Sequence, residues 1–257
     1  MKIHFSKYQA TGNDFVLIDN LSGAYSFTAD QIQKICDRRF GVGADGLMMI
    51  EKDDSAHFNL QYYNRDGSQS LCGNGSRAAV KMAAQLGLVN GKVRFQAFDG
   101  LHDAEIQPDG IVRLKMNDVH EVRQTGEDYF INTGSPHFVR FVSDLKNYPV
   151  YDNGKEIRYR DEFSPGGTNV NFVESQGANT IFVRTYERGV ENETLSCGTG
   201  VTAAALAASY HDFGSPVSVK TLGGDLQVEF KTSHSGIFKD IYLVGPAKMV
   251  FEGDLEL

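Results

Sequence analysis

The sequence predicts a mixed α and β protein built from two homologous halves, and a repeated motif is the main reason. A cysteine, a Gly-x-Gly turn and an alanine-rich run occur at 72–79 and again at 197–204, so that the two cysteines lie 125 residues apart. Three further pairs keep the same order at nearly the same offset: Tyr63-Asn64-Arg65 with Tyr186-Glu187-Arg188, Thr11-Gly12-Asn13 with Thr133-Gly134-Ser135, and Gly100 with Gly224. A period this long excludes a solenoid and favours two domains of similar size.

The first half is expected to combine short strands with helices. The N-terminal residues look like a first strand, and 14–19 form another around an apolar Phe-Val-Leu-Ile centre. Thr28 is the expected N-cap of a helix over 28–38, and a second helix over 73–87 follows the motif. Further strands are predicted at 47–50, 58–63, 92–98, 103–107 and 111–116.

The second half repeats this plan. Strands are predicted at 137–142, 168–174 and 180–186, a helix at 198–210, and several short strands between 217 and 254. The last piece, 247–257, has no counterpart in the first half, so we expect it to cross back and complete the first sheet. The predicted domains are therefore 1–115 with 247–257, and 116–246. A pseudo-symmetric pair would bring the two motifs face to face across a cleft, where small-molecule sites form.

Composition limits the classes of partner and compartment. The formal charge is −8 without a basic cluster, so neither nucleic acid nor an anionic membrane surface is expected as a partner. No apolar run is long enough to span a bilayer, and the N-terminus lacks the apolar segment of a signal peptide. Three cysteines do not make a disulfide framework. The cytoplasm, where thiols stay reduced, is the expected compartment.

The repeated motif places a thiol at the start of each of two helices. A free thiol has a pKa of ~8.5, and a helix N-terminus lowers such values to roughly 3.5–7.5. Glycine beside the cysteine lets the backbone approach a ligand, and the free N–H groups of the first turn stabilise a carboxylate that gains charge. Two copies supply a base for one face of a carbon and an acid for the other. This is the chemistry of a racemase or epimerase.

The residues that carry these motifs resemble the diaminopimelate epimerase family along the whole chain. Seven segments match in order: Gly12-Asn13-Asp14-Phe15-Val16, Asn64-Arg65-Asp66-Gly67-Ser68, Cys72-Gly73-Asn74-Gly75, Gly134-Ser135-Pro136-His137, Thr168-Asn169-Val170, Tyr186-Glu187-Arg188-Gly189 and Cys197-Gly198-Thr199-Gly200. The resemblance implies an α+β fold with two pseudo-symmetric domains, each a curved, mainly antiparallel sheet wrapped around a central helix. It also implies a cofactor-free and metal-free enzyme that interconverts LL- and meso-2,6-diaminopimelate, on the route to lysine and peptidoglycan.

The resemblance also implies roles for individual residues. Cys72 and Cys197 would be the acid–base thiols, and the α-carboxylate would be bound by the backbone N–H groups of Gly73, Asn74, Gly198 and Thr199. Glu187 and the Arg188 backbone would hold the reacting ammonium group. The distal end of the substrate would be bound by the side chains of Asn64, Asn169 and Arg188, with Asn13 nearby, and His137 would lie just behind the thiols. Relatives are often dimers, which allows a homodimer here.

Two residues depart from the family pattern. Family members often have asparagine where this chain has Ser135, and some have glutamine where it has Gly46. Both differences lie at the binding end of the predicted site, so they concern substrate affinity more than reaction type.

Other interpretations of the motifs fit these residues less well. Proline racemase-like enzymes usually have histidine where this chain has Asn74, and phenazine-biosynthesis isomerases lack the paired thiols. The alternative function is that of another amino-acid racemase of the same fold that needs no pyridoxal phosphate. A non-catalytic amino-acid-binding protein would not need two thiols. The cysteines have neither zinc nor redox-pair spacing. Cys36 is expected to be a buried hydrophobe. Gly41–Gly46 looks like a dinucleotide fingerprint but lacks the following helix, so a structural turn is expected.

Overall fold

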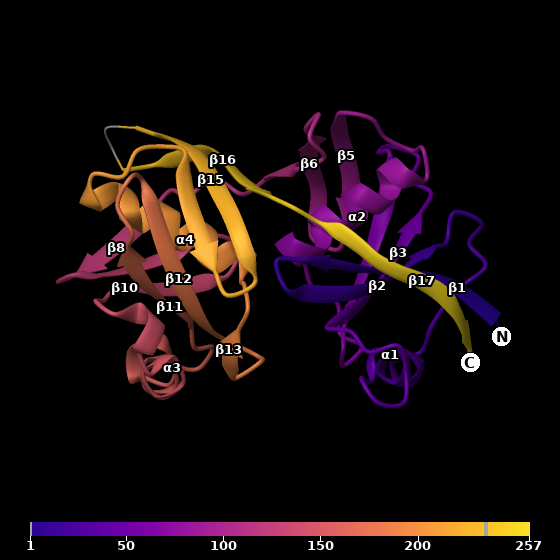
Figure 1. Cartoon of the computed structure of the whole chain (residues 1–257), viewed down its shortest axis with the longest axis horizontal. Helices are drawn as coiled ribbons and strands as arrows, with labels where there is room; N and C mark the ends of the chain where they lie inside the picture. Colours follow the sequence, from indigo (N-terminus) through magenta and orange to yellow (C-terminus); the bar gives the residue numbers. More distant parts are fainter. Residues whose placement is uncertain (1, 234–235) are drawn as a thin grey trace. The chain divides into compact units, whose positions relative to one another are not determined.

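The computed structural model describes residues 2–233 and 236–257, so residues 1, 234 and 235 of the predicted halves lie outside the described part. The chain forms two compact units, Met1–Leu114 with Gly245–Leu257, and Lys115–Val244. Each unit combines many strands with few helices (Figure 1), which confirms the predicted α+β class. No helix among the described residues is long and apolar enough to cross a membrane.

The first unit is a mixed, mainly antiparallel sheet. Each strand in the order β17-β1-β2-β3-β4-β5-β6-β7 pairs with its neighbours, and only β2–β3 and β4–β5 are parallel. The bounds are β1 Lys2–Ala10, β2 Asn13–Asp19, β3 Gly46–Glu51, β4 Phe58–Asn64, β5 Lys92–Ala97, β6 Gly100–Ile106, β7 Val112–Lys115 and β17 Lys248–Glu256. The C-terminal strand β17 thus runs beside the N-terminal strand β1 (Figure 1).

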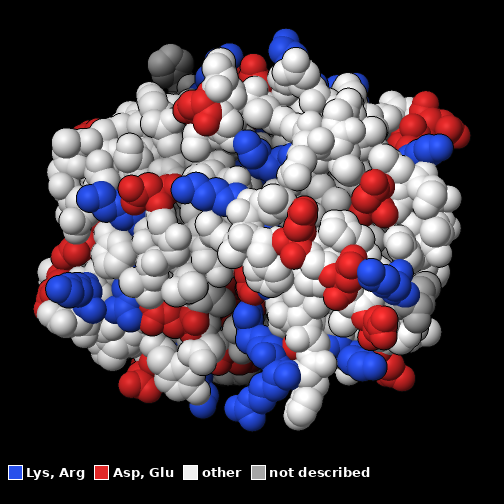
Figure 2. Space-filling model, turned by 45° about the vertical axis from the view of Figure 1, so that its right-hand side comes forward, with Lys and Arg blue, Asp and Glu red and all other residues white. Residues whose placement is uncertain are grey.

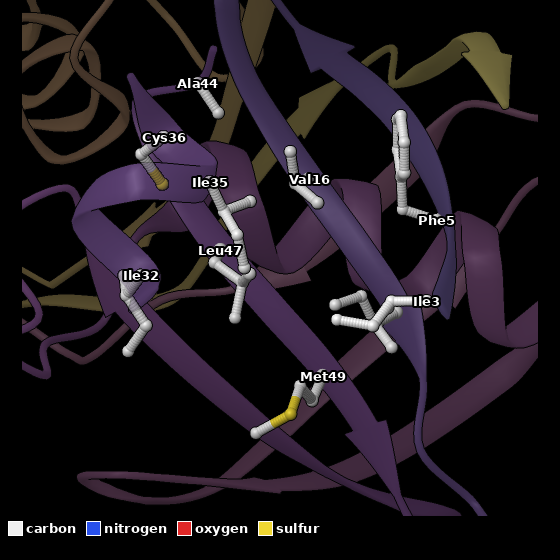
Figure 3. Close-up of a cluster of buried hydrophobic side chains, with 10 residues drawn as sticks. Ile3, Phe5, Val16, Ile32, Ile35, Cys36, Ala44, Leu47 and Met49 are labelled. Carbon is white, nitrogen blue, oxygen red and sulfur yellow. The ribbon is translucent and has the colours of Figure 1, made fainter. Parts of the chain in front are cut away.

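The helix that follows the first cysteine packs against this sheet. Helix α2 (Gly73–Gln85) contacts β1, β2, β3 and β4, and its small alanine side chains allow close approach. Successive residues of a strand point to opposite faces of the sheet. Every second residue of these strands therefore faces away from α2. There Ile32, Ile35 and Cys36 of α1 (Ala29–Cys36) pack on β1, β2 and β3 (Figure 3). Cys36 is therefore a core residue, as predicted.

The helix α1 begins where the sequence predicts it. The Thr28 side chain accepts a hydrogen bond from the Gln31 backbone N–H, and the Gln31 side chain returns one to the Thr28 backbone. This capping box satisfies two of the N–H groups that a helix start leaves without partners. The helix ends at Cys36, two residues before the predicted end.

The second unit repeats the strand pairing of the first. Strand β10 is parallel to β11, which is antiparallel to β12, which is parallel to β14, which is antiparallel to β15; the first unit shows the same sequence of pairings from β2 to β6. Strands β8 and β13 and the neighbours β9 and β16 complete the sheet. The bounds are β8 Val122–Thr125, β9 Asp128–Asn132, β10 Pro136–Phe141, β11 Asn169–Ser175, β12 Thr180–Glu187, β13 Asn192–Thr194, β14 Val217–Thr221, β15 Gly224–Thr232 and β16 Phe238–Gly245.

The helix after the second cysteine is the most buried element of this unit. Helix α4 (Gly198–Ala208) contacts strands β9–β12, β14 and β15 and is buried on nearly every side, as a helix that is apolar all round must be. A 3₁₀ turn, η3 (Ser209–His211), follows it. Two other 3₁₀ turns, η1 (Leu145–Asn147) and η2 (Asp161–Phe163), lie in the long segment between β10 and β11.

Helix α3 (Val150–Arg158) was not predicted, because asparagine and glycine lie at its centre. It buries Val150, Gly154 and Ile157, one stripe of a helix, in a cluster with Tyr186. A Cβ atom at Gly154 would lie 2.4 Å from Tyr186 Cβ, so only glycine allows this packing. Tertiary packing therefore outweighs the weak local propensity.

Candidate active site

The first half-site is built around Cys72 at the start of α2. Cys72 is the N-cap residue with extended backbone angles, φ −126° and ψ 114°. Its Sγ accepts a hydrogen bond of 3.5 Å from the backbone N–H of Gly75. This position stabilises the thiolate form of Cys72, because the N–H dipoles of the first helical turn point towards the sulfur.

Asn13, at the start of β2, links Cys72 to a charged network. The Asn13 Oδ1 atom lies 3.5 Å from Cys72 Sγ and accepts at 3.4 Å from the Asn74 side chain. The Asn13 Nδ2 donates to Asp45, whose other oxygen accepts at 2.8 Å from Arg38. Because Nδ2 is committed to a carboxylate, the carbonyl oxygen of Asn13 must face the thiol and Asn74.

Asp14 anchors this network in the sheet. Its carboxylate lies 2.7 Å from both Lys7 Nζ and Arg38 Nη2. Burial alone would raise the pKa of Asp14, but the hydrogen bonds from Arg38 and Lys7 outweigh it and hold the pKa below the usual value. The carboxylate therefore stays charged, and Arg38 bridges it to Asp45.

Arg77 lies in the second turn of α2 and is fully buried. Its guanidinium donates to the Gly73 carbonyl at 3.3 Å, to Thr11 Oγ1 at 3.3 Å and to Asn74 Oδ1 at 2.9 Å. Burial lowers the pKa of Arg77 to about 10, while the nearby Cys72 opposes this shift. Arg77 is thus a buried cation at neutral pH whose charge favours the thiolate of Cys72.

The second half-site is built around Cys197 at the start of α4. Cys197 is the N-cap residue with φ −114° and ψ 112°, close to the angles of Cys72, and its side chain is buried. Its Sγ lies 3.5 Å from Thr199 Oγ1. The Thr199 carbonyl accepts at 2.9 Å from Thr133 Oγ1, which ties the first helical turn to the loop before β10.

His137 lies behind Cys197 and Thr199, on β10. Its Nε2 atom lies 2.9 Å from Thr199 Oγ1, and its Nδ1 atom lies 3.1 Å from Asn171 Nδ2. Burial, helped by the charge of Arg188, lowers the pKa of His137 to about 3. The imidazole is therefore neutral at physiological pH and does not serve as a cationic acid.

Asn169, Ser135 and Arg188 meet at the ends of β10, β11 and β12. Asn169 Nδ2 donates at 2.9 Å to both Ser135 Oγ and the Pro136 carbonyl. Asn169 Oδ1 accepts at 2.9 Å from the Arg188 backbone N–H. The neighbouring Glu187 accepts at 2.8 Å from Thr194 Oγ1. The structure thus brings together three predicted binding residues of the second half, Asn169, Glu187 and Arg188, with Ser135 beside them.

Asn64, the remaining predicted residue of the first half, lies at the end of β4. Its side chain donates to Ser68 at 3.0 Å and accepts from Ser70 at 3.1 Å. These bonds shape the turn that leads into Cys72.

The departure at Gly46 has a local cause. A Cβ atom there would lie 2.5 Å from Cε2 of Tyr62 and 2.6 Å from the Tyr63 carbonyl oxygen. The Tyr62 ring packs edge-on against Phe15, with centroids 6.1 Å apart, and occupies the space beside Gly46. A glutamine at this position would collide with β4 of this chain.

Three residues of these half-sites were missed by sequence reasoning: Arg77, Asn171 and Asp45. The sequence carries a signal for each of them. Arg77 is one of two charged residues in an alanine-rich helix, Asn171 interrupts the apolar strand segment 170–173, and Asp45 lies in the turn interpreted as structural. Among the described residues, no group of three or more His, Cys, Asp or Glu side chains is arranged to hold a metal ion.

Comparison with known proteins gives matches over almost the whole chain. A family model described as diaminopimelate epimerase matches residues 5–122 and 129–250. The diaminopimelate epimerase of Flavobacterium psychrophilum is 47% identical over 256 residues, covering 98% of this chain and 99% of that protein. The diaminopimelate epimerase of Chlorobaculum tepidum is 41% identical over 257 residues, covering 96% and 98%.

Solved structures share the fold at low sequence identity. A PhzF-family phenazine biosynthesis protein of Bacillus anthracis superposes with a TM-score of 0.78 at 14% identity and covers 100% of both chains. A hydroxyproline epimerase from Agrobacterium vitis gives a TM-score of 0.69 at 15% identity, covering 99% of this chain and 92% of that one.

Proposed function

Because this chain belongs to the diaminopimelate epimerase family, we propose that Cys72 and Cys197 are the two acid–base groups of its reaction. The protein is an isomerase that interconverts LL- and meso-2,6-diaminopimelate. The observation that carries the assignment is that both cysteines are N-cap residues with nearly the same backbone angles, each followed by a glycine-rich first turn. No other cysteine has this position, since Cys36 ends α1 within the core.

In the proposed reaction one cysteine is a thiolate and the other a thiol. The thiolate removes the α-proton from one face of the carbon, and the thiol supplies a proton to the other face. The electron pair left by the C–H bond is stabilised through the adjacent carboxylate and is used to form the new C–H bond. The thiol and thiolate have then exchanged roles, which suits a reversible reaction, and the two thiols need no cofactor.

The carboxylate is held by helix N-termini in this proposal. The backbone N–H groups of Gly73 and Asn74, and of Gly198 and Thr199, belong to first turns, where N–H groups lack partners within the helix. Such donors stabilise negative charge that develops during proton removal.

The other polar residues position the rest of the substrate. Glu187 and the Arg188 backbone carbonyl hold the reacting ammonium group. The Arg188, Asn64 and Asn169 side chains bind the distal end. Asn169 is already oriented by Ser135 and the Arg188 N–H, so its amide is preorganised for this role.

Charge and compartment support a small metabolite as substrate. Acidic and basic side chains are interspersed over much of the face in Figure 2, and the formal charge is −8. We place the reaction in the cytoplasm, because reduced thiols persist there.

The test is proton NMR of reduced protein with LL-diaminopimelate in deuterated buffer without added cofactor. We expect the meso isomer to appear with deuterium at the inverted α-carbon. Cys72→Ala and Cys197→Ala should each lower turnover by at least about a thousandfold, as expected for loss of an essential acid–base group. Cys36→Ala is the matched control and should keep its activity.

Near-normal epimerisation by Cys72→Ala or Cys197→Ala would contradict the two-thiol assignment. If folded, reduced protein shows no exchange with diaminopimelate, the substrate assignment fails first. Proline, hydroxyproline, glutamate and aspartate are then tried in the same assay.

A further inference from the structure

The two half-sites differ behind the cysteines, although their strands pair in the same register. In the second unit His137 pairs opposite Asn169 on β11, and Asn171 pairs opposite Thr185 on β12. In the first unit the corresponding pairs are Phe15 with Gly46, and Met48 with Tyr62. The positions of His137, Asn171 and Thr185 are thus those of Phe15, Met48 and Tyr62.

The three polar side chains are almost completely buried and bonded to one another. His137 and Asn171 are 0% exposed and Thr185 is 3% exposed. Thr185 Oγ1 donates to Asn171 Oδ1 at 2.9 Å, and Asn171 Nδ2 donates to the Phe138 carbonyl at 2.9 Å. A buried polar chain costs stability unless every group has a partner, so a histidine, an asparagine and a threonine in place of Phe15, Met48 and Tyr62 call for a function.

The direction of each bond follows from chemistry. The Phe138 carbonyl only accepts, so the atom of Asn171 beside it is the amide nitrogen. The second hydrogen of that nitrogen meets His137 Nδ1 at 3.1 Å, so Nδ1 carries no proton. The imidazole is neutral because burial lowers its pKa to about 3, and its single proton is therefore on Nε2.

The proton on Nε2 decides how the Thr199 hydroxyl is oriented. His137 Nε2 donates to Thr199 Oγ1 at 2.9 Å, so the hydroxyl oxygen is an acceptor on that side. Its own hydrogen is then free to turn to Cys197 Sγ, which lies 3.5 Å from Oγ1. A hydrogen bond donated to sulfur favours the thiolate over the thiol.

We propose that Asn171 is a positioning residue, which holds His137 in the Nε2–H tautomer so that the Thr199 hydroxyl donates to the Cys197 sulfur. This inference rests on the proposed role of Cys197 as an acid–base thiol. It assigns a task to Asn171 and to the side chain of Thr199, neither of which follows from the motif.

The first unit reaches the same end differently. There Phe15, Met48 and Tyr62 take the places of His137, Asn171 and Thr185, and the buried cation Arg77 favours the thiolate of Cys72. Arg77 donates to the Gly73 carbonyl, and in the second unit Thr202 makes the equivalent bond to the Gly198 carbonyl at 2.9 Å. In the second unit the neutral Thr202 lies at the position of Arg77. The hydrogen bond from the Thr199 hydroxyl to Cys197 thus takes the place of the positive charge beside Cys72.

The experiment follows the tautomer and the thiols directly by NMR in the intact chain. Long-range ¹H–¹⁵N spectra, with His137 assigned from His137→Gln, report which ring nitrogen carries the proton. Cysteine labelled with ¹³C at Cβ gives one signal for each of the three cysteines, and each signal shifts when its thiol ionises. Both readouts are independent of turnover.

In the unsubstituted protein we expect His137 to be a neutral Nε2–H imidazole from about pH 5 to pH 9, above its lowered pKa. Thr199→Val should raise the ionisation midpoint of Cys197 by about one pH unit or more, the size expected for losing a hydrogen bond to a charged group. Thr199→Ser should restore it, and the midpoint of Cys72 should not move.

Asn171→Ala should raise the Cys197 midpoint too, and His137 should lose its single tautomer. Thr185→Val is the matched control: it removes a bond to Asn171 but leaves the Phe138 and His137 contacts, so tautomer and midpoint should stay. A structural role alone would predict the same result for both variants.

A proton on Nδ1 of His137 in the unsubstituted protein would overturn the inference, even if every variant failed to fold. An unchanged Cys197 midpoint in folded Thr199→Val would overturn it as well. If the NMR results hold while Cys197→Ala keeps its turnover, the proposed function fails and the hydrogen-bond chain stands.

Discussion

Arg77 Nη2 donates a hydrogen bond of 2.9 Å to Asn74 Oδ1, and both side chains are buried in the first turns of α2. The other acceptors of this guanidinium, Thr11 Oγ1 and the Gly73 carbonyl, are also uncharged. A buried cation bonded only to neutral acceptors creates a strong positive field, and in this half-site the field acts on Cys72.

Arg77→Met should therefore raise the ionisation midpoint of Cys72 by about one pH unit, because the thiolate loses a nearby positive charge. The midpoint is measured from the pH dependence of iodoacetamide labelling, with Cys72 identified by peptide mass spectrometry. Arg94→Met, which removes an exposed arginine paired with Asp103, is the control and should have no effect. An unchanged Cys72 midpoint in folded Arg77→Met would show that the helix N–H groups, and not Arg77, determine the ionisation of the Cys72 thiol.

The two glycines at the centres of the motifs should differ in their tolerance of alanine. A Cβ at Gly200 would lie 2.3 Å from Asn171 Oδ1, whereas a Cβ at Gly75 would meet Met48 Cε, the end of a flexible side chain. Gly200→Ala should lower the free energy of unfolding by about 2–3 kcal/mol, since a bonded, buried amide cannot move. Gly75→Ala should cost about 1 kcal/mol or less, because Met adapts and alanine favours the helix.

Urea unfolding of the two glycine variants measures this difference. Equal losses would mean that the polar chain behind Cys197 is as adaptable as the methionine behind Cys72.

Asp45→Ala should lower activity through Asn13, because Asp45 is bonded to Asn13 and not to Cys72. Asp45 accepts from the Asn13 amide, and without it that amide is free to turn its oxygen away from Cys72 and Asn74. We expect kcat/KM for diaminopimelate to fall about tenfold, the effect of one misplaced hydrogen-bonding group. Asp53→Ala, which removes a carboxylate bonded only within its own surface turn, should keep full activity. Full activity of Asp45→Ala would exclude Asn13 from the site.

The buried His137 should make the protein sensitive to mild acid. In the unfolded chain its pKa returns to about 6.5. In the folded protein the pKa is lowered to about 3, so between these values only the unfolded state binds the proton. Stability must then fall as pH drops from about 6.5 towards 3, by up to about 1.4 kcal/mol per pH unit.

Urea unfolding of the unsubstituted protein, His137→Gln and the exposed-histidine control His120→Gln at pH 7, 6 and 5 tests this sign. The decrease of the free energy of unfolding with falling pH should become smaller only in His137→Gln. If all three proteins lose stability in parallel, other groups cause the acid sensitivity.

Much of the fold was predictable because its signals are local. Thr28 and Gln31 form the capping box that begins α1, and the Gly-x-Gly turns with their alanine runs begin α2 and α4 at the predicted residues. Helix α3 was not predicted, since its packing against Tyr186 depends on a strand that lies later in the chain. The roles given to Asn13, Asn64 and the other binding residues stay predictions.

The sequence by itself determined the two halves, the family and the two cysteines at helix starts, because helix caps and a repeated motif depend on neighbours in the chain. Only the tertiary structure decided what lies behind each thiol. Asn171 meets His137 from 34 residues away and Arg77 meets Thr11 from 66 residues away, through strand register and helix packing. The partner of a buried polar group is set by which strands and helices pack together, and no local pattern specifies that.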